Sequence, residues 1–159
     1  MKVWADSSLM VRMLTPETGT AAIRAAVRTL KHPRLLFTPL HELEVVNALR
    51  VKFAVASKEV PARQRPPLTR QLESALARLK VSRSRGVFLE VALDWPATVG
   101  RALGLSEQLA ARLNPRAFDI LHVAGAHELH CEQFLTCDLR QASLAKAAGL
   151  KVTCVGVEA

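Results

Sequence analysis

Short apolar runs alternate with longer stretches of helical periodicity along the chain. We expect a strand in each run, and the runs span residues 2–5, 34–38, 87–93, 133–136 and 151–155. The intervening stretches place apolar residues at every third or fourth position, which is typical of helices that bury one face. We expect the first helix to begin at Leu9. The others are expected over 21–31, 40–57, 68–80, 96–113 (broken at Gly104 and restarted at Ser106), 118–129 and 139–148. Buried strands that alternate with helices favour an α/β fold, a parallel sheet with helices on both faces.

Composition narrows the class of protein. The chain has 159 residues, of which 50% are hydrophobic and 23% charged, and no linker or internal repeat divides it, so we expect a single domain over 1–159. No apolar stretch is long enough to span a membrane, and residues 1–14 lack the features of a signal peptide. Three cysteines without CxxC spacing indicate reduced thiols rather than a zinc site. We therefore expect a cytoplasmic protein with no membrane partner.

Positive charge is concentrated in one stretch. The net charge is +8, and the stretch from Arg50 to Arg85 is strongly basic, with Glu59 and Glu73 as its acidic residues. Its basic residues are Arg50, Lys52, Lys58, Arg63, Arg65, Arg70, Arg78, Lys80, Arg83 and Arg85. Such a concentration indicates a polyanionic partner, most simply a nucleic acid. A solvated helical face, or a surface for an acidic protein, would give the same pattern.

Four acidic residues occupy the positions where a parallel sheet collects its functional groups. Asp6 directly follows the first expected strand, Asp138 follows the fourth, Glu44 lies in the helix after the second strand, and Asp119 lies in the first turn of an apolar helix. Taken singly, Asp6 is a plausible helix cap and Asp119 a favourable charge at a helix start. Four converging carboxylates would repel one another unless a cation lay between them, and hard oxygen ligands favour Mg²⁺ or Mn²⁺.

The same residues resemble a known family. Asp6-Ser7-Ser8 after a strand, EVVNALR at 44–50, FDILHVAGA at 118–126, FLTCDLRQ at 134–141 and AKAAGLKV at 145–152 are similar, in order and spacing, to the PIN domain. Within that family, a compact chain resembles the VapC-type toxins of prokaryotic toxin–antitoxin pairs.

This resemblance implies a three-layer α/β/α sandwich around a five-stranded, mostly parallel sheet. It also implies that the protein is a Mg²⁺-dependent endoribonuclease that cleaves RNA, forms a homodimer and is bound by a cognate antitoxin. By position, the implied catalytic and metal-binding residues are Asp6, Glu44, Asp119 and Asp138. The implied supporting residues are Ser8 and Thr136, and Asn47, three residues after Glu44, is expected to face the site.

Several alternatives stay open at this stage. Glu42 could replace Glu44 as a ligand, although residues two apart on a helix do not share a face. His122, three residues after Asp119, is either a packed histidine or a general base. Trp4 and Trp95 are expected in the core or at an interface. A nuclease of RNA processing without an antitoxin, or a non-catalytic RNA- or protein-binding domain, would also fit.

Overall fold

The computed structural model describes residues 1–15, 20–30 and 33–155. Its elements, in chain order, are β1 (Lys2–Ala5), α1 (Ser7–Leu14), α2 (Thr20–Arg28), β2 (Arg34–Phe37), α3 (Pro39–Lys58), a 3₁₀ turn (Ala62–Gln64), α4 (Arg65–Ser84), β3 (Phe88–Glu90), α5 (Trp95–Leu113), α6 (Ala117–Glu128), β4 (Gln133–Thr136), α7 (Leu139–Ala147) and β5 (Val152–Cys154). The alternation of strands and helices is as expected from the sequence. Residues 16–19, between the helix expected from Leu9 and the helix expected over 21–31, lie outside the described residues, as does the expected end of the second helix at residue 31.

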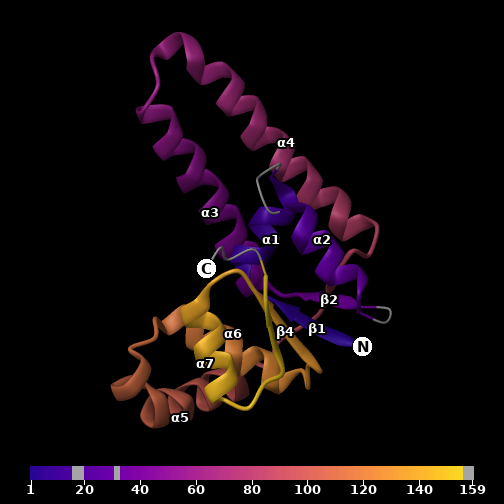
Figure 1. Ribbon diagram of the computed structural model, residues 1–159, viewed down its shortest axis with the longest axis vertical. Coiled ribbons are helices and arrows are strands. Elements are labelled where there is room, and N and C mark those ends of the chain that lie inside the picture. The colour runs from indigo at the N-terminus through magenta and orange to yellow at the C-terminus, as the bar shows by residue number, and fades with distance from the viewer. Residues whose placement is uncertain (16–19, 31–32, 156–159) are drawn as a thin grey trace.

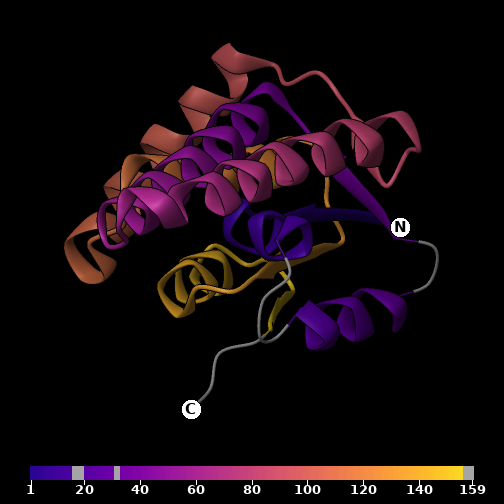
Figure 2. The ribbon, with the colours of Figure 1, turned by 90° about the horizontal axis from the view of Figure 1, so that it is seen from above.

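All five strands are parallel, in the order β3-β2-β1-β4-β5. Successive residues of a strand face opposite sides of the sheet, so each central strand feeds two cores. On one face Val3, Ala5 and Leu135 pack with α1 to α4, and on the other Trp4 and Phe134 pack with α5 to α7. The result is the expected three-layer α/β/α sandwich around a five-stranded parallel sheet (Figures 1 and 2).

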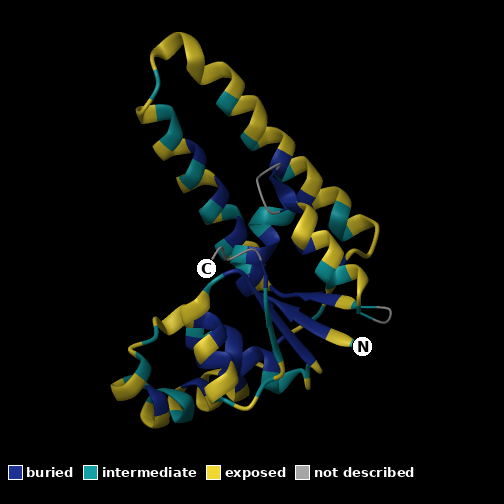
Figure 3. Cartoon of the chain, in the orientation of Figure 1, coloured by how far each residue is buried: buried dark blue, intermediate teal, exposed yellow. Residues whose placement is uncertain are grey.

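Helices α3 and α4, with the residues between them, form an antiparallel pair that projects away from the sheet and is named here the hairpin arm (Figure 1). Along α4 most residues are exposed, and Ala75 and Leu79 are buried where α1 approaches (Figure 3). The Arg78 guanidinium also donates a 3.0 Å hydrogen bond to the Leu14 carbonyl of α1. The basic stretch of the sequence is thus the surface of an extended arm.

Two expected helix boundaries are wrong, for different reasons. Gly104 does not break α5, which is continuous. A helical glycine costs about 1 kcal/mol relative to alanine, and burial of Ala102 and Leu109 on either side outweighs that cost. Pro66 and Pro67 precede the helix expected over 68–80, yet they lie in the first turn of α4, where the missing N–H groups have no intrahelical partner to lose.

The described residues contain no helix that is both long and apolar enough to cross a membrane. All three cysteines are free thiols, as expected. Burial raises the pKa of Cys131 to about 12 and that of Cys137 to about 11, so both thiols stay protonated at neutral pH.

Candidate functional site

The candidate site lies at the carboxyl ends of β1 and β4. The chain leaves β1 for β2 on one side, while β4 pairs with the other side of β1. Loops therefore diverge at this point of the sheet, which is where open α/β folds bind their ligands. Asp6 follows β1 here, and Thr136 ends β4 beside it.

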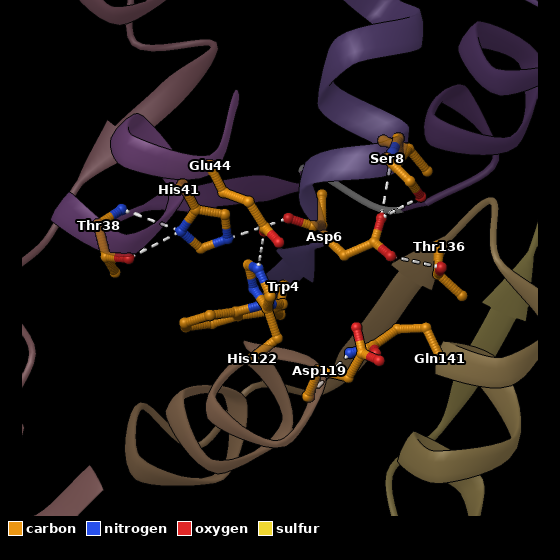
Figure 4. A network of polar contacts seen from close by, with 12 residues as sticks. Trp4, Asp6, Ser8, Thr38, His41, Glu44, Asp119, His122, Thr136 and Gln141 are labelled. Carbon is orange, nitrogen blue, oxygen red and sulfur yellow. Dashed lines mark hydrogen bonds and ion pairs between the residues drawn. The ribbon is translucent and has the colours of Figure 1, made fainter. Parts of the chain in front are cut away.

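Asp6 is a buried carboxylate held by three hydrogen bonds (Figure 4). As the N-cap of α1, its Oδ1 accepts from the Leu9 amide at 3.0 Å and from the Ser8 hydroxyl at 2.7 Å, and its Oδ2 accepts from the Thr136 hydroxyl at 2.6 Å. Burial raises the pKa of Asp6 even though these hydrogen bonds act in the opposite direction. Asp6 forms no ion pair with any described basic side chain. Its charge is thus expensive to bury, and a bound cation would compensate it.

Thr136 connects Asp6 to Asp138. The Thr136 hydroxyl oxygen accepts from the Asp138 amide at 2.9 Å while donating to Asp6. The Asp138 carboxylate itself caps α7, accepting from the Arg140 amide at 2.7 Å, and lies 3.6 Å from the Arg140 guanidinium. On the same edge, the Ser8 hydroxyl accepts from the Cys137 amide at 3.1 Å. Asp138 is therefore near Asp6 through one shared hydroxyl, and its own oxygens serve a helix end.

Asp119 also occupies a helix start. Its Oδ2 accepts from the Arg116 amide at 3.1 Å, at the beginning of α6. Gln141 joins α7 to this turn, because its side-chain amide donates to the Asp119 carbonyl at 3.1 Å. The Gln141 Oε1 is buried without a protein partner. Asp119, Arg116 and Arg140 line a hollow of about 210 Å³.

Glu44 points from α3 toward α6, where it meets a buried histidine. The Glu44 Oε2 and the His122 Nε2 are 2.5 Å apart, and the His122 Nδ1 accepts from the Trp4 indole at 3.0 Å. Burial by itself raises the pKa of Glu44. The hydrogen bond and the electrostatic interaction with His122, together with a Ser7 hydrogen bond, bring that pKa below its usual value. Of the two interpretations of His122, the packed histidine is confirmed, since 2% of the residue is exposed.

A second buried histidine lies under the same edge. The His41 Nδ1 accepts from the Thr38 amide at 3.1 Å, and its Nε2 lies 3.0 Å from the Ala5 carbonyl, one residue before Asp6. Burial lowers the pKa of His41 well below its usual value, so the ring is neutral. A neutral ring that accepts at Nδ1 carries its proton on Nε2 and donates it to Ala5. His41 therefore ties the first turn of α3 to the end of β1.

The neighbours of Glu44 lie on different faces of α3. Glu42 turns away and pairs with Arg83 at 2.6 Å, so Glu44 is the acid of this helix that faces His122. Asn47 is exposed and lines a hollow of about 250 Å³ with Leu43, Glu44 and Phe118. The expectation that Asn47 lies on the same side as Glu44 agrees with this placement.

The four acids are bridged rather than clustered. Within the described ranges, no three His, Cys, Asp or Glu side chains stand close enough to hold one metal ion. Thr136 links Asp6 to Asp138, Gln141 links the Asp138 helix to Asp119, and His122 interacts electrostatically with Asp6 as well as with Glu44. The donor set consists of oxygens, and the buried carboxylate of Asp6 forms no ion pair with a described basic side chain, which fits a hard ion such as Mg²⁺. The ligand set itself stays a prediction.

Two side chains of this edge were missed or underrated by sequence reasoning. Gln141 had a signal, since Asp138 followed three positions later by a glutamine matches the capping pattern of a helix start. The structural role of His122 had none, because its partner Trp4 lies 118 positions earlier in the chain. Trp4 is in the core as expected, whereas Trp95 is 39% exposed.

Comparison with known proteins gives the fold and nothing finer. No protein-family model and no curated protein match the chain. Among solved structures, the chain is similar to VapBC2 of Rickettsia felis bound to a DNA fragment from its promoter, with a TM-score of 0.61 at 10% identity over 98% of this chain and 100% of the other. It is also similar to FitAcB of Neisseria gonorrhoeae, with a TM-score of 0.56 at 15% identity over 94% of this chain and 95% of the other. The third is VapBC-1 of nontypeable Haemophilus influenzae, with a TM-score of 0.55 at 10% identity over 97% of this chain and 98% of the other.

These neighbours overturn one expectation from the sequence. Assignment of the chain to the VapC-type toxins, as a PIN-domain ribonuclease, is wrong as a family assignment. The matched structures are toxin–antitoxin complexes, named for both of their components, and identities of 10 to 16% show a shared fold alone. The local motifs that suggested the family are strand ends and helix starts, which the fold itself imposes.

Proposed function

We propose that the chain is a Mg²⁺-dependent endoribonuclease that hydrolyses RNA phosphodiester bonds. The reaction would take place at the part of the molecule that carries Asp6, Glu44, Asp119 and Asp138, named here the acidic edge. The observation that carries the proposal is Asp6 itself. A carboxylate that is 4% exposed, placed where the loops diverge, with its pKa raised by burial and no described basic partner, is a costly arrangement for stability alone. Such cost is typical of functional sites.

The chain's own residues divide the work. Asp6, Glu44 and Asp119 would hold the cation, with Asp138 in support, and Mn²⁺ would substitute for Mg²⁺. Ser8 and Thr136 fix both oxygens of Asp6 in place. When bound, the cation supplies a water nucleophile at neutral pH and stabilises the charge that develops on the phosphate.

A trough from the acidic edge to the hairpin arm supports a polyanionic substrate. The hollow that contains Glu44 shares Leu43 and Asn47 with a larger hollow of about 490 Å³, which continues to the basic side chains of Arg50 and Lys80. Basic side chains bind the phosphate groups of RNA of any nucleotide sequence. This arrangement would therefore hold an RNA strand while one of its phosphodiester bonds lies at the acidic residues.

The test compares two aspartates that cap helices. Purified wild-type protein, Asp6→Asn and Asp94→Asn are incubated with single-stranded and hairpin RNA in Mg²⁺, Mn²⁺ or EDTA, and the products are separated on gels. Asp94 caps α5, accepting from the Ala97 amide at 3.0 Å, so its variant controls for the loss of a capping charge. We expect cleavage by wild type and Asp94→Asn with either metal, and none by Asp6→Asn or in EDTA. Cleavage by Asp6→Asn at the wild-type rate, or undiminished cleavage in EDTA, would refute the proposal.

A protein partner is the second element of the proposal. The structural neighbours are complexes of two components, and we propose an antitoxin-like partner that covers the trough, together with a homodimeric state. Light scattering of the purified chain measures the oligomer. Co-purification with the product of an adjacent small gene, together with loss of RNA cleavage in the complex, tests the partner.

A further inference from the structure

Trp4, His122 and Glu44 form a chain of hydrogen bonds from the core to the acidic edge (Figure 4). The Trp4 indole donates to the His122 Nδ1 at 3.0 Å, and the His122 Nε2 contacts the Glu44 Oε2 at 2.5 Å. The three residues come from β1, α6 and α3, so the chain crosses from the sheet to both helices that border the site. None of its hydrogen bonds is needed for the proposed chemistry as described so far.

The direction of these hydrogen bonds fixes the tautomer of His122. An indole N–H is a donor only, so Nδ1 must present its lone pair to Trp4. The proton of the neutral ring then lies on Nε2, and the ring donates it to Glu44. Because both ring nitrogens are engaged and the residue is 2% exposed, His122 has no free nitrogen to serve as a general base.

The surroundings of His122 keep this direction from changing. The ring centroid lies 5.7 Å from that of Trp4 and 5.1 Å from that of His41, so rings pack against it from two sides. Trp4 is itself fully buried, against Gly125 of α6. Glu44, by contrast, keeps 28% of its side chain exposed. A rigid donor therefore holds one oxygen of a carboxylate that still reaches the surface.

From this geometry we infer that His122 is a positioning residue, which orients Glu44 toward a divalent cation through its Nε2–H, with Trp4 fixing the tautomer. The inference rests on the proposed function for the presence of the cation. Groups behind a ligand commonly fix its orientation in this way and affect metal affinity without touching the metal. A core histidine that merely fills space would have no such effect.

The tautomer is measured on the wild-type protein by long-range ¹H–¹⁵N NMR of the histidine rings. We expect the His122 signals of a ring protonated at Nε2 only, and a mixture of tautomers in Trp4→Phe, which retains the aromatic ring but lacks the indole N–H. A wild-type ring protonated at Nδ1 would overturn the inference, as would an unchanged Nε2–H tautomer in a folded Trp4→Phe.

Cation affinity is measured by calorimetric titration with Mn²⁺ alone, on variants whose folding is verified by circular dichroism. We expect His122→Phe to weaken Mn²⁺ binding by about 10- to 100-fold, and His122→Gln, which can place an N–H donor near the same position, to recover most of that loss. His127→Gln is the matched control, because His127 lies on the same helix and its Nε2 bonds the Ala148 carbonyl at 2.9 Å.

The two proposals fail in different ways. If the wild-type protein binds no Mn²⁺, the proposed function fails, and the inference fails with it. If the wild type binds Mn²⁺ and folded His122→Phe loses no more Mn²⁺ affinity than His127→Gln, the inference alone fails. Should His122→Phe not fold, the tautomer of the wild-type ring decides, because a ring protonated at Nδ1 refutes the inference whether or not Mn²⁺ binds.

Discussion

Gly125→Ala tests whether the Trp4 ring is as tightly packed as the site requires. A methyl group at position 125 would lie 2.5 Å from the Trp4 Cη2 and 3.1 Å from its Cζ2 and Cζ3, whereas carbon atoms prefer separations of about 3.5 to 4.0 Å. The ring would have to move by about 1 Å to restore that separation. Its centroid lies 4.4 Å from that of His41, and no part of it reaches solvent, so the shift must disturb other buried groups.

Two opposing effects set the magnitude. Overpacking a core costs about 1 to 3 kcal/mol. Replacing a glycine inside a helix by alanine returns up to about 1 kcal/mol. We therefore expect Gly125→Ala to lower the free energy of unfolding by about 1 to 2 kcal/mol, which lowers the melting temperature by about 2 to 8 °C for a chain of this size.

The matched control is Gly100→Ala in α5. A methyl group there would meet nothing within 4 Å, so only the helix effect remains, and we expect a gain of about 0.5 to 1 kcal/mol. Urea unfolding followed by circular dichroism measures both variants. If Gly125→Ala were as stable as Gly100→Ala, the packing argument for Trp4 would be refuted, and with it the rigidity assigned to His122.

Three further outcomes follow from the structure. Because burial raises the pKa of Asp6, its ionised form destabilises the fold at neutral pH. We therefore expect Asp6→Asn to raise the free energy of unfolding at pH 7, measured in urea titrations, by about 0.5 to 2 kcal/mol. A lower free energy of unfolding in Asp6→Asn would contradict this reasoning. Burial lowers the pKa of His41, so the neutral ring stabilises the fold fully above about pH 6.5. The free energy of unfolding then declines as pH falls, by at most about 1.4 kcal/mol per pH unit, and we expect His41→Gln to flatten that decline. Arg83 forms ion pairs with Glu42 and Glu90, at 2.6 Å each. We expect Arg83→Met to lower the free energy of unfolding by about 1 kcal/mol in low salt and by less in 1 M NaCl. A decrease that does not depend on salt would show that Arg83 stabilises the fold by packing.

The architecture was predictable because hydrophobic periodicity reports burial directly. Five strands and the helices between them appear where the apolar pattern places them, and Asp6 caps the first helix as its position indicates. Helical geometry indicated that only one of Glu42 and Glu44 faces the site, and the family resemblance selected Glu44. The structure places the two on different sides of α3. Local patterns are sufficient for features that depend on neighbouring residues.

The family assignment failed for the same reason that the fold prediction succeeded. Asp6 and Asp138 are N-caps after parallel strands, and Asp119 lies in the first turn of a helix, where acids stabilise any helix of this kind. These positions therefore carry information about the fold rather than about one family. Contacts such as that of Trp4 with His122 depend on tertiary packing between distant segments, and periodicity contains no signal for them.

Helix α3 has the proportions of a lever, because His41 ties its first turn to the end of β1 while its other end lies far out on the hairpin arm. Glu44 lies about 7.5 Å along the helix axis from Pro39, and Lys58 about 28 Å, at a rise of 1.5 Å per residue. If the helix pivots as a straight rod about its first turn, a displacement of about 4 Å at the distal end moves Glu44 by about 1 Å. Shifts of that size in a reacting group change rates by about 100-fold. A ligand that pivots α3 as a rigid rod would therefore change the position of Glu44 without contacting it.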